Sequence, residues 1–201
     1  MRHNETLSKF RQYLRPGCVY RRADLAKFSS NVDRHLARLV TEGHLKKLSH
    51  GLYMAPKQTA FGEAPPEDDA LLRTFLKDDH FVVYSPNQFN SLGLGTTQLY
   101  NRLIVFNRKR VGEFTLDGRT YLFHRWREAP KQLTPEFLVV ELLNRLNQIA
   151  EDREQVVERL RKKMSEFDRA RLLNSARRFG TLSTQKRLEA LMNRKGTEAT
   201  R

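Results

Sequence analysis

Three polar side chains recur at helical spacing near the N-terminus. Asn31, Arg34 and Arg38 are three or four residues apart, so a helix would place them on one face. In the major groove of DNA, arginine pairs with the edge of guanine and asparagine with the edge of adenine. The spacing therefore predicts a recognition helix that reads base edges, and we include the neighbouring Ser30 and His35 among its DNA contacts.

A short basic segment follows that helix. We expect a β-hairpin over residues 44–55, because a Ser-His-Gly turn separates two short apolar stretches. Lysines and small polar groups on such a wing can reach phosphates or the adjacent groove. The wing adds four residues to the predicted DNA-binding set: Lys46, Lys47, Ser49 and His50.

These side chains need a scaffold, and the first 57 residues can supply one. Apolar residues at helical spacing and turn signals between them predict the following elements: helices over 4–14, Arg22–Phe28 and Asn31–Glu42, and a short strand over Cys18–Tyr20. Ser30 and Asp33 resemble a capping box at the start of the third helix, and Gly43 is suited to end it. Residues 1–57 are therefore predicted to form a winged helix-turn-helix.

The charge of the chain supports a polyanionic partner. Residues 1–57 carry 12 basic and 4 acidic side chains, residues 58–150 carry 11 of each, and residues 151–201 carry 14 basic and 8 acidic, for a net charge of +14. Because the excess lies at both ends, a second basic surface is a possibility, with a solvated helical face or a docking face for an acidic partner as alternatives. Its candidates are Arg161, Lys162, Lys163, Arg169, Arg171, Arg177 and Arg178.

The rest of the chain predicts a second domain. Residues 58–66 contain glycine and two prolines without periodicity, which indicates a linker. Residues 67–201 are expected to form an antitoxin-type α+β domain that ends in basic helices. The expected elements are a helix over Glu67–Lys77, strands over Phe81–Tyr84 and Leu103–Phe106, a short helix opened by Ser85-Pro86, a hairpin around Asp117-Gly118, a helix from Thr134 to about Ile149, and helices broken near Asp152, Ser165 and Gly180. Its expected core comprises Phe81, Val83, Leu103, Val105, Leu122 and Leu138. The fold class is therefore α+β, with an N-terminal winged helix-turn-helix followed by a mixed α/β domain.

The composition disfavours secreted, disulfide-bonded and membrane proteins. The single cysteine, Cys18, cannot form an internal disulfide, which favours a reducing cytoplasm. Apolar stretches fall far below the ~20 residues that span a bilayer, and no signal peptide is expected. An amphipathic membrane helix is disfavoured because acids are interspersed with the basic residues. We therefore expect a cytoplasmic protein without a membrane partner.

No catalytic constellation emerges. The histidines lack H-E-x-x-H spacing, no G-x-S-x-G elbow exists, and Gly93-Leu-Gly95 is too short for a dinucleotide fingerprint. The clusters 67–69 and 78–80 contain acids and a histidine, but they are more typical of helix ends than of metal ligands. We expect no catalytic residue, no metal and no cofactor, and hence no enzyme.

Three blocks of sequence resemble a known family. The block 38–56 holds the end of the predicted recognition helix and the wing. The block 91–98 reads Ser-Leu-Gly-Leu-Gly-Thr-Thr-Gln and is followed by a predicted strand, the predicted hairpin and the segment 119–125. The block 169–178 is basic and is followed by Gly-Thr at positions 180–181. In this order they resemble AbiEi-type antitoxins, the DNA-binding half of bacterial type IV toxin–antitoxin pairs. The resemblance spans most of residues 5–193.

This resemblance implies two activities. The winged helix would bind inverted repeats in its own promoter and repress the operon, and two copies per operator would match such a repeat. The remaining domain would counteract a nucleotidyltransferase-like toxin. The chain departs from the family pattern at Gly95 and at Leu99-Tyr100-Asn101. Carried onto this chain, the DNA-binding role falls on Arg34, Arg38, Lys46, Lys47 and His50.

Alternative functions remain open at this point. The chain could be a protein-interaction module that docks directly onto a partner toxin, or a stand-alone winged-helix regulator. An RNA-binding factor is less favoured, because the sequence offers no aromatic platform on which single-stranded bases could stack.

Overall fold

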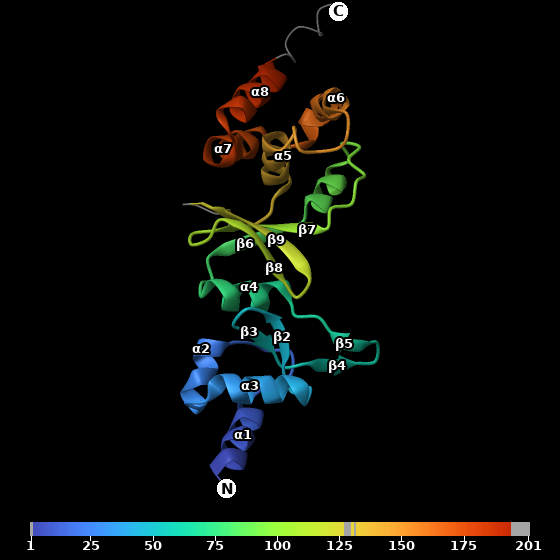
Figure 1. The fold of residues 1–201 in the computed structure, drawn as a ribbon. Coiled ribbons are helices and arrows are strands. Elements are labelled where there is room, and N and C mark those ends of the chain that lie inside the picture. Colours follow the sequence, from blue (N-terminus) through green and yellow to red (C-terminus); the bar gives the residue numbers. More distant parts are fainter. Residues whose placement is uncertain (1, 127–129, 131, 194–201) are drawn as a thin grey trace, which may run out of the picture. The chain divides into compact units, whose positions relative to one another are not determined.

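The computed structural model describes residues 2–126, 130 and 132–193, with side chains from residue 7 onward. It has the predicted α+β fold (Figure 1). Two compact units are present: residues 1–83 with 104–126, and residues 84–103 with 127–201. The predicted linker over 58–66 does not separate the two units, because the residues on both sides of it belong to the first unit. The chain leaves this unit after residue 83 and returns to it at residue 104, where it contributes further strands.

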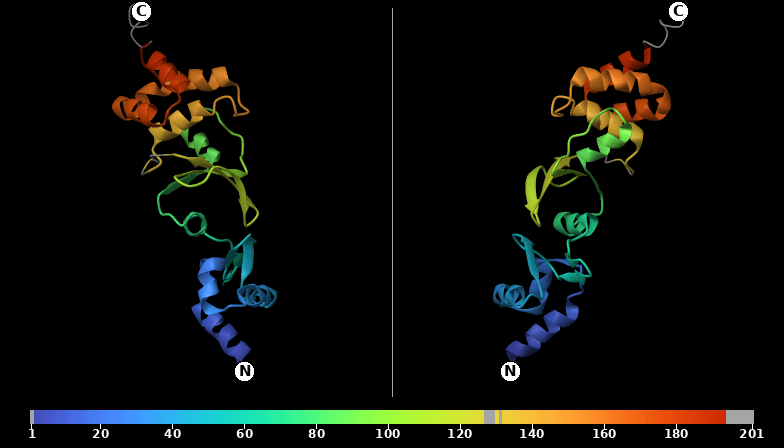
Figure 2. Two further views of the ribbon diagram at one scale, coloured as in Figure 1. Left: turned by 60° about the vertical axis from the view of Figure 1, so that its left-hand side comes forward. Right: turned by 90° about the vertical axis from the view of Figure 1, so that its right-hand side faces the viewer.

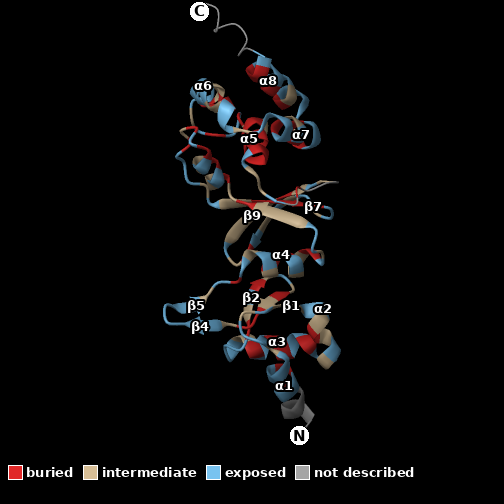
Figure 3. Ribbon diagram, turned by 180° about the vertical axis from the view of Figure 1, so that it is seen from behind, coloured by how far each residue is buried: buried red, intermediate tan, exposed pale blue. Residues whose placement is uncertain are grey.

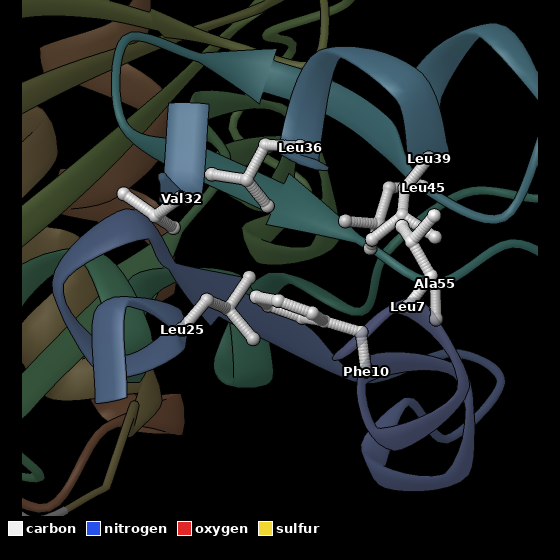
Figure 4. Close-up of a cluster of buried hydrophobic side chains, with 8 residues drawn as sticks. All are labelled: Leu7, Phe10, Leu25, Val32, Leu36, Leu39, Leu45 and Ala55. Atoms are coloured by element: carbon white, nitrogen blue, oxygen red, sulfur yellow. The ribbon is translucent and has the colours of Figure 1, made fainter. Parts of the chain in front are cut away.

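The first unit begins with a winged helix-turn-helix. Its elements are α1 (Arg2–Tyr13), β1 (Val19–Arg21), α2 (Arg22–Leu25), the 3-10 helix η1 (Ala26–Phe28), α3 (Val32–Thr41), β2 (Lys46–Ser49) and β3 (Leu52–Met54). The three strands form an antiparallel sheet in the order β1-β3-β2. Apolar side chains from the helices and the sheet gather in one core, shown in Figure 4: Leu7, Phe10, Leu25, Val32, Leu36, Leu39, Leu45 and Ala55.

The predicted linker is itself structured. Strands β4 (Lys57–Thr59) and β5 (Gly62–Ala64) form an antiparallel hairpin. Gly62 takes a left-handed φ of 103°, and the hydroxyl of Thr59 donates to the Gly62 carbonyl at 2.7 Å. Gly62 adopts the positive φ that the turn of this hairpin requires. The stretch lacks the apolar alternation typical of strands, so its sequence did not indicate a hairpin.

A four-stranded sheet follows α4 (Asp68–Leu76). Its strands are β6 (Phe81–Tyr84), β7 (Arg102–Asn107), β8 (Gly112–Leu116) and β9 (Arg119–Arg125), in the order β6-β7-β9-β8. The predicted Asp117-Gly118 turn is confirmed, since both residues have positive φ and Leu116 pairs with Arg119. Of the expected core residues, Val105 and Leu138 are buried, whereas Phe81, Val83, Leu103 and Leu122 are only half-buried. On β9 the neighbours of Leu122, Tyr121 and Phe123, are buried instead.

The second unit is mainly helical. It contains the 3-10 helices η2 (Pro86–Leu92) and η3 (Met164–Glu166) and the α-helices α5 (Pro135–Asn144), α6 (Arg153–Lys163), α7 (Arg169–Phe179) and α8 (Leu182–Asn193). Helix α5 is buried along most of its length (Figure 3). It packs against α7 and α8, as both views of Figure 2 show. Pro135 at the first position and the hydroxyl of Thr134 begin α5 as predicted, but the helix ends at Asn144 rather than near Ile149.

Candidate nucleic-acid interface

Helix α3 buries one face and exposes the other. Val32, Leu36 and Leu39 enter the core of the winged helix. Arg34 and Arg38 lie one turn apart on the exposed side. Within the described part of the chain, no ion pair engages Arg34. Its guanidinium is therefore available to an external anion or base edge.

Arg38 is exposed but held by an acid. Its Nε donates to Oε1 of Glu42 at 2.8 Å, and Arg11 donates to the other carboxylate oxygen at 2.7 Å. Hydrogen bonds from Arg38 and then Arg11 lower the pKa of Glu42. The contact fixes the Arg38 side chain through Nε and offsets part of its charge, so Arg34 is the less neutralised of the two arginines.

His35 does not belong to the exposed face. It is 3% exposed, its Nδ1 lies 2.8 Å from the hydroxyl of Ser29, and its ring centroid is 5.9 Å from that of Phe10. Position 35 follows Val32 by three residues and precedes Leu39 by four, so it shares the face of α3 that these two residues turn toward the core. The predicted DNA contact of His35 is therefore wrong, and its role is in packing the recognition helix.

The start of α3 differs from the predicted capping box. Ser30 and Asn31 are both exposed, and Asn31 occupies the N-cap without a side-chain cap bond. The hydroxyl of Ser29 accepts a hydrogen bond from the Asn31 amide at 3.0 Å. Asp33 is not used for capping, because Arg22 engages its carboxylate. The side-chain amide of Asn31 makes no cap hydrogen bond and thus remains available beside the arginines.

Arg22 is a residue that the sequence did not reveal as part of the site. Its Nε and Nη2 donate to the two carboxylate oxygens of Asp33 at 2.6 and 2.5 Å, which lowers the pKa of Asp33. The backbone amide of Arg22 donates to the Gly51 carbonyl at 2.9 Å. One residue therefore links the first turn of α3 to the turn of the wing. Eleven residues separate Arg22 from Asp33, so no local periodicity could indicate the pair.

The wing itself has the predicted form. Strands β2 and β3 meet at a short turn in which Gly51 has a left-handed φ of 68°. Lys47 and His50 are exposed, whereas Ser49 is half-buried. The tip thus offers one cation and one imidazole to a partner.

Lys46 is placed differently from its neighbour. Its Nζ lies 3.0 Å from the Asp117 carboxylate and 3.3 Å from that of Glu63, and hydrogen bonding to Asp117 is the main cause of its raised pKa. The amide of Asp117 also donates to the Leu48 carbonyl at 3.0 Å. The β8–β9 turn therefore covers the edge of β2. Two carboxylates neutralise Lys46, so its predicted DNA contact is not supported by the structure.

The seven basic residues of the predicted second surface are not equivalent. Arg161 pairs with Glu158, Lys163 with Glu166 and Arg171 with Asp168, each within one helical turn or its cap. Arg178 lies over the ring of Phe179, with 4.9 Å from Cζ to the ring centroid. Three are exposed and form no ion pair with a described side chain: Lys162, Arg169 and Arg177. Local acids thus offset much of the charge that the composition suggested.

Cationic side chains engage the two acidic clusters at residues 67–69 and 78–80. Arg73 bridges Asp69 and Asp79 at 2.7 and 2.9 Å. Asp78 accepts hydrogen bonds from His80, which together with the nearby Lys109 lower its pKa to about 2. Among the described residues, no three potential ligands converge on one point.

No family model matches this chain, and neither does any curated protein. The fold is similar to the crystal structure of the RV2827C protein from Mycobacterium tuberculosis, with a TM-score of 0.57 and 19% sequence identity over 96% of this chain and 76% of that one. At this identity the likeness shows the fold alone. No helix in the described ranges is long and apolar enough to cross a membrane.

Proposed function

We propose that this protein binds double-stranded DNA through its winged helix, with α3 in the major groove and the wing tip beside the phosphate backbone. The observation that carries the proposal is the bridge made by Arg22. It ties the first turn of α3 to the Gly51 turn, so that the exposed face of the helix and the tip of the wing are held as one surface. Asn31, Arg34 and Lys47 provide that surface with donors.

The arrangement suits the two tasks that DNA recognition requires. Base edges are read by side chains on a helix, and phosphates are held by cations around it. Arg34 and Asn31 fit the first task, because both are exposed and neither side chain forms a hydrogen bond or ion pair with another described residue. Lys47 and His50 fit the second. Arg38 keeps its Nη groups for DNA while Glu42 orients its Nε.

We further propose, from the resemblance to AbiEi-type antitoxins, that the protein represses its own operon at an inverted repeat and counteracts a nucleotidyltransferase-like toxin. A winged helix followed by a helical second unit supports this proposal. A reporter fused to the native promoter should be repressed by the full chain. Co-expression with the product of the adjacent gene should show whether the chain also protects cells, and a chain that represses without protecting would be a stand-alone regulator.

Replacing Arg34 with alanine should weaken binding to the native operator by about 1–3 kcal/mol, because a guanidinium that reads guanine loses its hydrogen bonds. That corresponds to a loss of affinity of roughly 5- to 150-fold. Fluorescence anisotropy on the operator and on a scrambled duplex measures the effect. The loss should be larger on the operator, and equal losses on the two duplexes would show that Arg34 contacts only phosphate.

The two wing lysines provide a matched pair of substitutions. Lys47→Ala should weaken binding to all sequences alike and reduce the salt slope of log K by about 1, because one phosphate contact is lost. Lys46→Ala should leave affinity nearly unchanged, because Asp117 and Glu63 already neutralise that lysine. Titrations at several salt concentrations separate the two variants. An equal loss for Lys46→Ala would mean that DNA displaces its carboxylate partners.

A further inference from the structure

A second candidate site on the first unit involves none of the residues proposed to contact DNA. It is a cleft of about 780 Å³ lined by the end of α1, strand β1, helix α2 and the end of α4. None of its lining residues belongs to the exposed face of α3 or to the wing turn. Pockets for small molecules commonly have about 300–1,000 Å³, so the cleft can hold a ligand of cofactor size.

The cleft is strongly cationic. Five of its lining residues are basic: Arg15, Arg21, Lys27, Arg73 and Lys77. Asp69 and Asp79 hold Arg73 by ion pairs, but no ion pair with a described side chain engages the other four. Asp24 is the one carboxylate among the described residues that line the cleft. An uncompensated positive charge in a concave site favours a ligand with several negative charges.

An exposed tyrosine ring lines the same cleft as these cations. Tyr13 lines the cleft and remains 45% exposed, although its ring packs against Phe28 and Tyr20 at centroid distances of 4.6 and 5.6 Å. An exposed aromatic ring next to cations is suited to stack a base while the cations hold phosphates. A ligand that is only anionic would leave this ring unused.

The walls of the cleft are fixed rather than loose. The hydroxyl of Tyr20 accepts a hydrogen bond from the Arg15 amide at 2.7 Å and lies 3.4 Å from the Tyr13 carbonyl, which ties the end of α1 to β1. Lys77, which lines the cleft at the C-cap of α4, has a left-handed φ of 51°. Glycine or asparagine usually occupies such a position, so a lysine at this point places a cation on the cleft at some conformational cost.

We propose that this cleft binds a nucleoside di- or triphosphate, with the base on Tyr13 and the phosphates among Arg15, Arg21, Lys27 and Lys77. The proposal is independent of the DNA-binding function. It rests on the coincidence of volume, uncompensated positive charge and an exposed aromatic ring in one concave site.

A native cysteine in the cleft can report ligand binding. Cys18 is the single cysteine of the sequence, is exposed, and lines the cleft. Modification of Cys18 by the neutral reagent N-ethylmaleimide can therefore be followed in the full chain by mass spectrometry. ATP and GTP at millimolar concentration should slow the modification in a saturable manner. Adenosine alone and tripolyphosphate alone should each require much higher concentrations, because each satisfies only one part of the site.

Substitutions test the same site independently. Lys27→Ala and Arg21→Ala should each weaken protection by ATP about tenfold, the loss expected for one charge-assisted contact. Lys27 is exposed, so its variant should keep the fold, and an unchanged rate of modification without ATP confirms that the cleft is intact. Arg34→Ala, on the DNA-binding face, is the matched control and should leave protection unchanged.

Three outcomes would overturn the proposal. The first is an unchanged rate of Cys18 modification at saturating ATP and GTP. The second is equal protection by tripolyphosphate and ATP, which would reduce the site to a simple anion site. The third is protection by duplex DNA but not by nucleotides, which would make the cleft part of the DNA interface. Because operator binding is measured separately, failure here leaves the proposed DNA-binding function untouched.

Discussion

Phe10→Ala should lower the stability of the winged helix by about 3–5 kcal/mol, the cost of removing a large side chain from a packed core. Phe10 is 0% exposed, and its ring packs against Phe28 with 5.6 Å between centroids and against His35. Since folded domains are stable by only about 5–15 kcal/mol, the loss should unfold a substantial part of the population of this unit on mild heating. Operator binding should then be lost with the fold.

Hydrogen exchange measured by mass spectrometry can locate this effect. Peptides from α1 to β3 should exchange faster in Phe10→Ala, while peptides from α5, α7 and α8 in the second unit serve as the internal reference. The matched control is Phe61→Ala, the same substitution at a side chain that is 100% exposed. It should change stability by no more than about 0.5 kcal/mol. Equal effects of the two variants would contradict the packing described for α1.

Local signals predicted most of the winged helix and of the later elements. The apolar spacing of α1 and α3 and the Asp117-Gly118 turn are properties of neighbouring residues, and the structure confirms them. The expected break near Asp152 is also confirmed, because the Asp152 carboxylate accepts hydrogen bonds from the first-turn amides of α6. Such signals act within a few residues, so a sequence can reveal them.

Contacts between distant residues decided what could not be predicted. Lys46 looks like a wing cation in sequence, but Asp117 meets it from 71 residues away. The position of His35 within the polar run of α3 suggested exposure, whereas packing against Phe10 buries it. The sequence therefore predicts which residue types are present on the recognition face. Tertiary contacts then select the members that remain available.

The early end of α5 has a similar origin. Asn144 is its last residue, and its side chain makes four hydrogen bonds in the second unit. Its Nδ2 donates to Glu141 Oε1 and to the Phe179 carbonyl, both at 2.9 Å. Its Oδ1 accepts from the Thr181 amide at 3.0 Å and from the Thr184 hydroxyl at 2.8 Å. One amide thus joins the end of α5 to the turn between α7 and α8.

Asn144→Ala should destabilise the second unit by about 3 kcal/mol. Removing the amide leaves its partners without hydrogen bonds in a partly buried place, and each unsatisfied group costs about 1–3 kcal/mol, less where water can enter. Urea unfolding followed by circular dichroism measures the shift in midpoint. Asn147→Ala is the matched control, because Asn147 is exposed three residues further along the chain, and it should be close to neutral.

A double-mutant cycle separates this network from simple loss of packing. Thr184→Ala alone should cost less than Asn144→Ala, because Thr184 shares one of the four hydrogen bonds. The double variant should cost less than the sum of the two, since the shared bond can be lost only once, and the coupling should be about 0.5–1.5 kcal/mol. Strict additivity would show that the amide and the hydroxyl act separately. Coupling of the expected size would establish that Asn144 links the end of α5 to the first turn of α8 through a specific hydrogen bond.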